Sequence, residues 1–143
     1  MRAIARNAML VCVAAAFASA DAHDDVMEAI TSMAGALTEV NIPKFMTAFS
    51  KDMADYDTLE NNVTALAKQA ELSSSIQPLH EDGNDQARTI DLDWAMQVRG
   101  LEQDGPILQR REVVHCELRK QNKHWKIVAL KPIDFFAPAK LGQ

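Results

Sequence analysis

The sequence predicts an α+β domain in which three helices from the first half of the chain cover a curved antiparallel sheet of about four strands. Two observations support this fold class. Polar and apolar residues alternate over residues 89–99 and 111–119, which is the pattern of half-buried strands, and a third strand is expected over residues 124–130. Earlier in the chain, apolar residues recur every three or four positions, as they do on one face of an amphipathic helix. The apolar face of the sheet therefore has a cover available within the same chain.

Residues suited to helix starts mark the boundaries of the helices. The first helix is expected to end at Val40, because Asn41 can cap a second helix that has Pro43 in its first turn. Asp57 and Glu60 have the spacing of a capping box and predict the start of the third helix. All three helices precede the long alternating strand.

The first and last parts of the sheet region carry their own signals. A first strand is expected over residues 73–80, but Pro78 restricts it to a sheet edge or a bulge because proline has no amide proton to donate. After the last strand, Phe135 and Phe136 are expected to pack against one end of the sheet. Residues 139–143 are expected to form a flexible tail.

Residues 1–20 have the pattern of a signal peptide. A basic start is followed by an apolar stretch over residues 8–17 and by small residues that end at Ala20. A second small-residue pattern ends at Ala22, so cleavage is expected after one of these two alanines. The apolar stretch is much shorter than the roughly 20 residues that span a bilayer. We therefore expect a periplasmic or secreted protein with no membrane span in the mature chain.

Charge and cysteine content exclude several classes of function. The formal net charge of −5 argues against nucleic-acid binding, which requires a basic stripe. Cleavage would leave Cys116 as the only cysteine, and it shares the apolar positions of its strand, so we expect a buried thiol without a disulfide. The four histidines lack the spacing of metal ligands, and no glycine-rich phosphate loop is present. No metal and no cofactor are expected.

The order of the predicted elements resembles the nuclear transport factor 2-like superfamily, whose members have a cystatin-like α+β cone. The resemblance covers residues 21–138. Its most specific parts are Asp82-Gly83 before the long strand, Arg110-Arg111 in the next strand and Trp125-Lys126-Ile127 near the end, which together are similar to small exported bacterial members of unknown function. The resemblance implies a pocket between the helices and the sheet, and a homodimer formed through the outer face of the sheet. The superfamily includes ketosteroid isomerase, dehydratases and polyketide-cyclase-like enzymes, so the fold alone sets no function.

Candidate catalytic residues gather around the only tyrosine of the chain. Members of the isomerase type have a phenol on the first helix, and this first helix has no tyrosine. Tyr56 instead lies before the third helix and next to Asp55, and a nearby carboxylate or His80 are its candidate acid–base partners. The alternative interpretation is structural, with a half-buried ring and a helix cap.

Large apolar side chains are candidates for the lining of a ligand pocket, and they can equally fill the core. These residues are Phe45, Phe49, Met53, Tyr56, Trp94, Met96 and Trp125. The polar face of the sheet mixes both charge signs, which suits a solvated surface or a two-fold interface. On that face Asp93 and His115 are expected to meet across neighbouring strands, as a surface pair or dimer contact.

Three functions remain open from the sequence. The favoured one is an exported, non-enzymatic dimer that binds a small apolar ligand or a protein partner. The second is a small polyketide-cyclase-like or dehydratase-like enzyme that uses Tyr56. The third is a purely structural assembly module.

Overall fold

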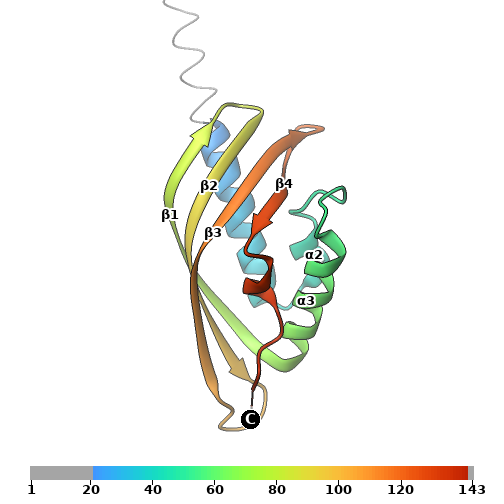
Figure 1. Ribbon diagram of the computed structural model, residues 1–143, viewed down its shortest axis with the longest axis vertical. Helices are drawn as coiled ribbons and strands as arrows, with labels where there is room; N and C mark the ends of the chain where they lie inside the picture. The colour runs from blue at the N-terminus through green and yellow to red at the C-terminus, as the bar shows by residue number, and fades with distance from the viewer. Residues whose placement is uncertain (1–20, 142–143) are drawn as a thin grey trace, which may run out of the picture.

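The computed structural model describes residues 21–141 and confirms the predicted α+β architecture. Three helices are followed by a four-stranded antiparallel sheet with the strand order β1-β2-β3-β4. Figure 1 shows the sheet as a strongly curved layer with the helices on its concave side. The predicted signal peptide lies outside the described residues. None of the helices in the described part of the chain is long and apolar enough to cross a membrane.

The first helix is described over residues 21–38, and it packs one apolar stripe against the sheet. Val26, Ile30, Met33 and Leu37 of this stripe are at most 1% exposed. Their spacing of three or four residues places them on one side of the helix. The helical spacing therefore identified the buried face correctly up to Leu37, whereas Val40, the predicted end of the helix, lies in the turn after it and is 48% exposed.

The second helix, α2 (Ile42–Met46), has the predicted cap but is short. The side-chain oxygen of Asn41 accepts a hydrogen bond from the amide of Lys44 at 3.2 Å. After α2 the chain turns and runs beside the last strand, where the amide of Ser50 donates to the carbonyl of Ile127 at 2.8 Å. This segment covers the exposed edge of the sheet, which would otherwise present unpaired backbone groups.

The third helix, α3 (Tyr56–Gln69), begins earlier than predicted. Asp55 occupies the cap position without a side-chain hydrogen bond, and the amide of Leu59 donates to the carbonyl of Asp55 at 2.8 Å. The first helical turn is thus closed before a capping box at Asp57 could act, and that prediction is wrong. Asp57 lies in the first turn, where a negative charge is favourable beside the helix dipole.

The four strands are longer than the alternating patterns. They are β1 (Ala70–Gly83), β2 (Ala87–Gly100), β3 (Ile107–Gln121) and β4 (His124–Lys131). Pairing with β2 extends β1 in both directions beyond residues 73–80. The expectation for Pro78 is confirmed, because β1 is an edge strand and its register shifts between Pro78 and His80.

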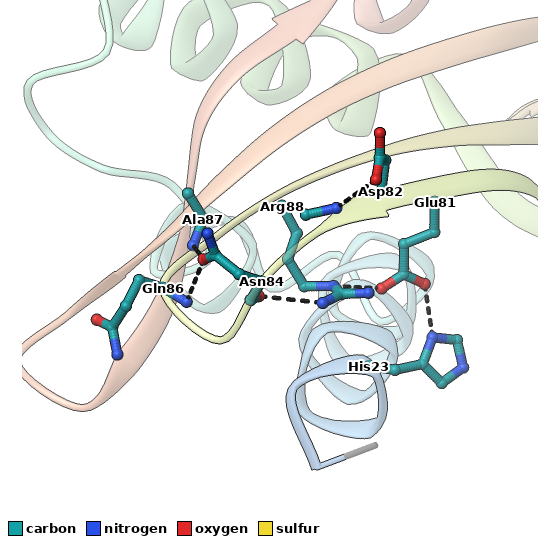
Figure 2. A network of polar contacts seen from close by, with 8 residues as sticks. His23, Glu81, Asp82, Asn84, Gln86, Ala87 and Arg88 are labelled. Carbon is teal, nitrogen blue, oxygen red and sulfur yellow. Dashed lines mark hydrogen bonds and ion pairs between the residues drawn. The ribbon is translucent and has the colours of Figure 1, made fainter. Parts of the chain in front are cut away.

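The hairpin between β1 and β2 is fastened to the start of the first helix by a polar network (Figure 2). Glu81 on β1 contacts Nδ1 of His23 at 2.5 Å with one carboxylate oxygen and accepts from Nε of Arg88 at 2.6 Å with the other. At the turn, Gly83 has a φ of +131°, and an added Cβ would lie 2.3 Å from the carbonyl oxygen of Ala87. Glycine is therefore required there.

The tail is fixed at its first residue. Ala139 is 7% exposed, and its backbone exchanges two hydrogen bonds with the side-chain amide of Gln69, at 2.9 and 2.7 Å. The prediction of a flexible tail that begins at residue 139 therefore does not hold for Ala139, which is packed against the domain. The predicted docking of Phe135 and Phe136 is confirmed, since both residues belong to the 3-10 helix η1 (Ile133–Phe136) and both rings are buried.

Candidate functional site

An aromatic cluster occupies the space between the helices and the centre of the sheet. Trp94 of β2 is fully buried, and its ring centroid lies 5.6 Å from that of Phe135 and 5.2 Å from that of Phe136. Phe45 of α2 extends the cluster, with its centroid 5.7 Å from that of Phe136. The indole N–H of Trp94 donates to the hydroxyl of Ser74 at 2.9 Å. The indole N–H, which is the one polar group of this side chain, thus has a hydrogen-bond partner inside the fold.

The structure separates the residues that were predicted to line one pocket. Phe45, Met53 and Trp94 are at most 7% exposed and belong to the core. Phe49 and Tyr56 border one surface hollow, and Trp125 borders another. Met96 is a core residue that also reaches a small recess of about 200 Å³ between β1, β2 and β3. The predicted lining residues are therefore distributed over the core and the margins of the domain.

The hollow beside Tyr56 has a volume of about 560 Å³ and lies between α2, the start of α3 and the β3–β4 end of the sheet. Asp52 and Glu60 share its lining with Tyr56, as do Ser50 and Gln121. Asp55 is exposed at the helix cap, and His80 is exposed on edge strand β1. Neither residue lines this hollow. The carboxylates that share this hollow with Tyr56 are thus Asp52 and Glu60, and not the sequence neighbour Asp55.

A second hollow, which we name the Trp125 hollow, lies between the first helix, α2 and the β3–β4 turn. Its volume is about 410 Å³, and its lining residues are Asp25, Glu28, Ala29, Ser32, Met33, Lys44, Thr47, Ala48, Lys123, His124, Trp125 and Lys126. Trp125 is 7% exposed, and its indole N–H has no hydrogen-bond partner. It is the one such buried side-chain atom within residues 21–141.

The outer face of the sheet carries two charged pairs. His115 meets Asp91 rather than Asp93, because Asp91 is its register partner, and Nδ1 lies 2.5 Å from the carboxylate oxygen. Asp93 instead accepts two hydrogen bonds from Arg111, at 3.0 and 2.7 Å. The predicted pairing of Asp93 with His115 is therefore wrong by two residues along the strand, which is the next position on the same face. The hydrogen bond from Arg111 lowers the pKa of the Asp93 carboxyl below its ordinary value.

The remaining candidate groups point to structural roles. Cys116 is fully buried, and burial raises the pKa of its thiol to about 12, so the reactive thiolate is scarce at neutral pH. In the part of the chain that the structure describes, no group of three or more histidine, cysteine, aspartate or glutamate side chains is placed to hold a metal ion.

No known family model and no curated protein matches the sequence. Solved structures do match the fold. A proposed scytalone dehydratase from Novosphingobium aromaticivorans has a TM-score of 0.73 at 9% identity, over 80% of this chain and 85% of that chain. A proposed dehydratase of the nuclear transport factor 2-like family from Streptomyces avermitilis has a TM-score of 0.67 at 11% identity, over 78% and 95% of the two chains.

A third structure, a protein of unknown function with a cystatin-like fold from Nostoc punctiforme, has a TM-score of 0.58 at 15% identity, over 74% of this chain and 85% of that chain. The chain therefore has the nuclear transport factor 2-like, cystatin-like fold, and the resemblance inferred from the sequence is confirmed at this level. Identities this low describe the fold and leave the function to the residues of each site.

Sequence reasoning missed most residues of the Trp125 hollow. Asp25 and Glu28 are three positions apart on the polar face of a helix, which is the ordinary pattern of a solvated surface. Lys123 lies in the tight turn after β3 and has a φ of +70°. Only the helix crossing and the strand pairing place these charges around one hollow, so the sequence contains no local signal for it.

Proposed function

We propose that this chain is an exported, non-enzymatic domain that works as a dimer, with the outer face of its sheet as the interface. The observation that carries the proposal is the combination of paired charges and an exposed apolar centre on that face. Val113 is 54% exposed and lies opposite Asp93 in the register of β2 and β3. The two charged pairs, Asp91 with His115 and Asp93 with Arg111, surround it.

This arrangement suits association with a second copy. A two-fold interface uses the same patch on both subunits, so a patch that contains both charge signs can complement itself. An apolar centre with a polar rim is the usual anatomy of an interface. The filled aromatic cluster gives a protein partner more support than an apolar ligand held inside the cone, because Trp94 and its neighbours already occupy that space.

Analytical ultracentrifugation of the chain that begins at Asp21 tests the proposed interface. We expect a dimer that Val113→Arg converts to a monomer, because a buried unpaired charge is costly. Val40→Arg is the matched control: Val40 is 48% exposed and lies in the turn between the first helix and α2, outside the strands, so this variant should stay dimeric. A monomeric parent chain, or a dimer that Val113→Arg leaves intact, would contradict the interface.

Export is tested separately by the amino-terminal sequence of the protein recovered from its host. We expect the mature chain to begin at Asp21 or His23, in the periplasm or the culture medium. Recovery of a cytoplasmic protein that retains residues 1–20 would overturn this part of the proposal.

A second candidate function is a dehydratase-like enzyme at the Tyr56 hollow. The specific observation in its favour is that Tyr56, Asp52 and Glu60 line the same hollow, where a phenol and a carboxylate can act as acid and base. Two structures of similar fold are proposed dehydratases. Tyr56→Phe should then abolish turnover in a screen of dehydratase substrates and leave the urea midpoint unchanged. Equal turnover by the parent and the variant would exclude this candidate.

A further inference from the structure

We propose that the edge of β1 pairs with the β1 edge of a second copy of this chain, in antiparallel orientation and about a two-fold axis at Ser75. This contact lies at the side of the sheet, so it does not depend on the dimer proposed for the outer face. Three features support it: an uncovered strand edge, a symmetric placement of Glu71 and His80 about Ser75, and a hollow beside the edge.

The two edges of the sheet differ in their cover. The β4 edge is covered by the segment after α2, where the amide of Ser50 donates to the carbonyl of Ile127. In the described part of the chain β1 pairs with β2 alone, and no backbone hydrogen bond from any other segment reaches residues 71–80. Figure 1 shows β1 at the left border of the sheet, with no described helix or strand beyond it. The unpaired backbone groups of such an edge are a template for another strand.

The sequence of β1 leaves much of this edge unprotected. Proteins commonly block strand edges with charged side chains, proline or bulges. Pro78 and the register shift that follows it protect one part of β1. Residues 72–79 contain no charged side chain, and residues 73–75 are three serines with small side chains. The edge therefore presents no charge or bulky group that would keep a second strand away from residues 72–77.

The pairing of β1 with β2 shows that Glu71 and His80 lie at equal distances from Ser75 along the ladder. Three paired residues, 72–74, separate Glu71 from Ser75. Three paired residues, 76–78, also separate Ser75 from His80, because the register shift passes over Leu79. A two-fold axis at Ser75 therefore places Glu71 of each copy opposite His80 of the other.

These opposing residues make the two ends of the contact self-complementary. Glu71 and His80 are both exposed, and the carboxylate can accept a hydrogen bond from an imidazole N–H of the second copy. Within each copy, Glu71 is level with Arg99, and His80 is level with Asp91. Carboxylates therefore alternate with basic side chains along one row across the joined sheets, which is the favourable arrangement for cross-strand pairs. The two-fold axis repeats this row at the other end of the contact.

A hollow on the helix side of the β1 edge has room for an apolar side chain of the second copy. Its volume is about 290 Å³, and it is lined by Thr31, Ala34, Gly35, Thr38, Ser74 and Ile76. No atom lies within 4 Å of the position that a Cβ of Gly35 would occupy. In the proposed register Ile76 of the second copy lies opposite Ser74, on the face of the sheet that borders this hollow. The hollow has no charged lining, so it suits the isoleucine side chain.

The small size of the contact sets the conditions under which it forms. Stable protein interfaces use about 20–30 residues on each side, whereas nine paired positions of β1 take part here, residues 71–78 and 80. We therefore expect the edge contact in concentrated solution, where it joins the proposed dimers side by side. In dilute ultracentrifugation samples the outer-face dimer is expected alone.

Disulfide trapping tests the two-fold axis at Ser75. The chain that begins at Asp21 is prepared with Val113→Arg, to remove the proposed outer-face dimer, and with either Ser75→Cys or Ser73→Cys. The native Cys116 is buried. Two opposed residues of an antiparallel pair have Cα atoms about 4.5–5.5 Å apart, within the range of a disulfide. Two copies of residue 73 would be four positions apart, or about 13 Å, which is too far.

We expect Ser75→Cys to give a disulfide-linked dimer on mild oxidation in concentrated solution, and Ser73→Cys to react at least about tenfold more slowly. Equal rates at the two positions, or no dimer with Ser75→Cys, would overturn the proposal. Failure of the outer-face dimer would leave this result unchanged, because every sample carries Val113→Arg. The two proposals can therefore fail separately.

Charge reversal at Glu71 tests the register of the contact. Adding Glu71→Lys to the Ser75→Cys protein should slow disulfide formation about threefold or more, because a lysine would then face His80. Glu117→Lys is the matched control, since it makes the same charge change at an exposed residue of β3, two strands from the edge. Circular dichroism checks that both variants remain folded. An unchanged rate with Glu71→Lys, or equal slowing by both substitutions, would contradict the pairing of Glu71 with His80.

Discussion

The two tryptophans of this chain lie on the same sheet and have opposite surroundings. Trp94 is on central strand β2, is fully buried, contacts two phenylalanine rings and donates its N–H to Ser74. Trp125 is on edge strand β4, is 7% exposed, borders a charged hollow and has no acceptor for its N–H. The buried donor at the centre of the cone thus has an acceptor, whereas the one at its margin has none.

This difference shows where binding can be sought in this chain. The filled aromatic centre of the cone stabilises the fold, because close-packed rings bury large apolar areas. At the margins, by contrast, loops and helix ends bring exposed charges together around open hollows. The following predictions test the contrast between the two tryptophans, from the largest expected effect to the smallest.

The largest effect is expected from Trp94→Ala. Removing a fully buried aromatic side chain typically costs about 3–5 kcal/mol, since a cavity remains among rings that cannot collapse into it. Urea denaturation followed by circular dichroism measures the free energy of unfolding. A loss below about 1 kcal/mol would mean that Trp94 does not hold the centre together.

Ser74→Ala is expected to have a moderate effect on stability. The substitution leaves the indole N–H of Trp94 without its acceptor, which costs about 1–3 kcal/mol for a buried donor. The same urea experiment measures the loss, and Ser73→Ala is a suitable control because Ser73 is the exposed neighbour on β1. Equal stability of the two variants would show that the hydrogen bond to Ser74 contributes nothing.

Trp125→Phe should have little effect on stability, or a slightly favourable one. Phenylalanine keeps one aromatic ring, and the cost of the space left by the smaller side chain is partly offset because the removed N–H has no partner to lose, so the free energy of unfolding should change by no more than about 1 kcal/mol. Trp94→Phe should destabilise the protein by more than this, because that variant also leaves the hydroxyl of Ser74 without its hydrogen-bond donor. A larger loss for Trp125→Phe than for Trp94→Phe would reverse the comparison.

The smallest effect concerns a pair outside both regions. Arg111 lowers the pKa of Asp93, so the pair contributes stability above the unfolded-state pKa and loses it as the pH falls through the folded-state value, below about pH 4. Asp93→Asn should therefore destabilise slightly at neutral pH, with a difference from the parent that shrinks in acid. A difference that grows as the pH falls from 5 to 2 would contradict this assignment.

Much of the fold could be predicted because its signals are local. The alternation from Ile90 to Val98 identified the buried face of β2, and Asn41 identified the start of α2. The capping box at Asp57 was wrong because two alternative helix starts lie within one turn, and tertiary packing decided between them. The partner of His115 was predicted two residues away from Asp91, because alternation fixes the face of a strand and leaves the register open.

The candidate sites were less predictable, because they depend on contacts between distant segments. Whether Trp94 and Trp125 line one pocket or two environments follows from the path of α2 and η1 across the sheet. That path is not encoded in any single pattern. The Trp125 hollow joins residues separated by about a hundred positions, from Asp25 to Lys126, and none of them stands out in its own segment.

The most direct test of the contrast is the NMR spectrum of the two indole N–H groups in uniformly ¹⁵N-labelled protein, recorded for the parent and for Ser74→Ala. The chain has two tryptophans, so two indole signals are expected, and Trp125→Phe assigns them. The signal of Trp94 should shift in Ser74→Ala because its N–H loses its acceptor, while that of Trp125, which has no acceptor to lose, stays in place. A shift confined to Trp125, or an unchanged Trp94 signal in Ser74→Ala, would contradict the contrast between a hydrogen-bonded centre and an unpartnered donor at the margin.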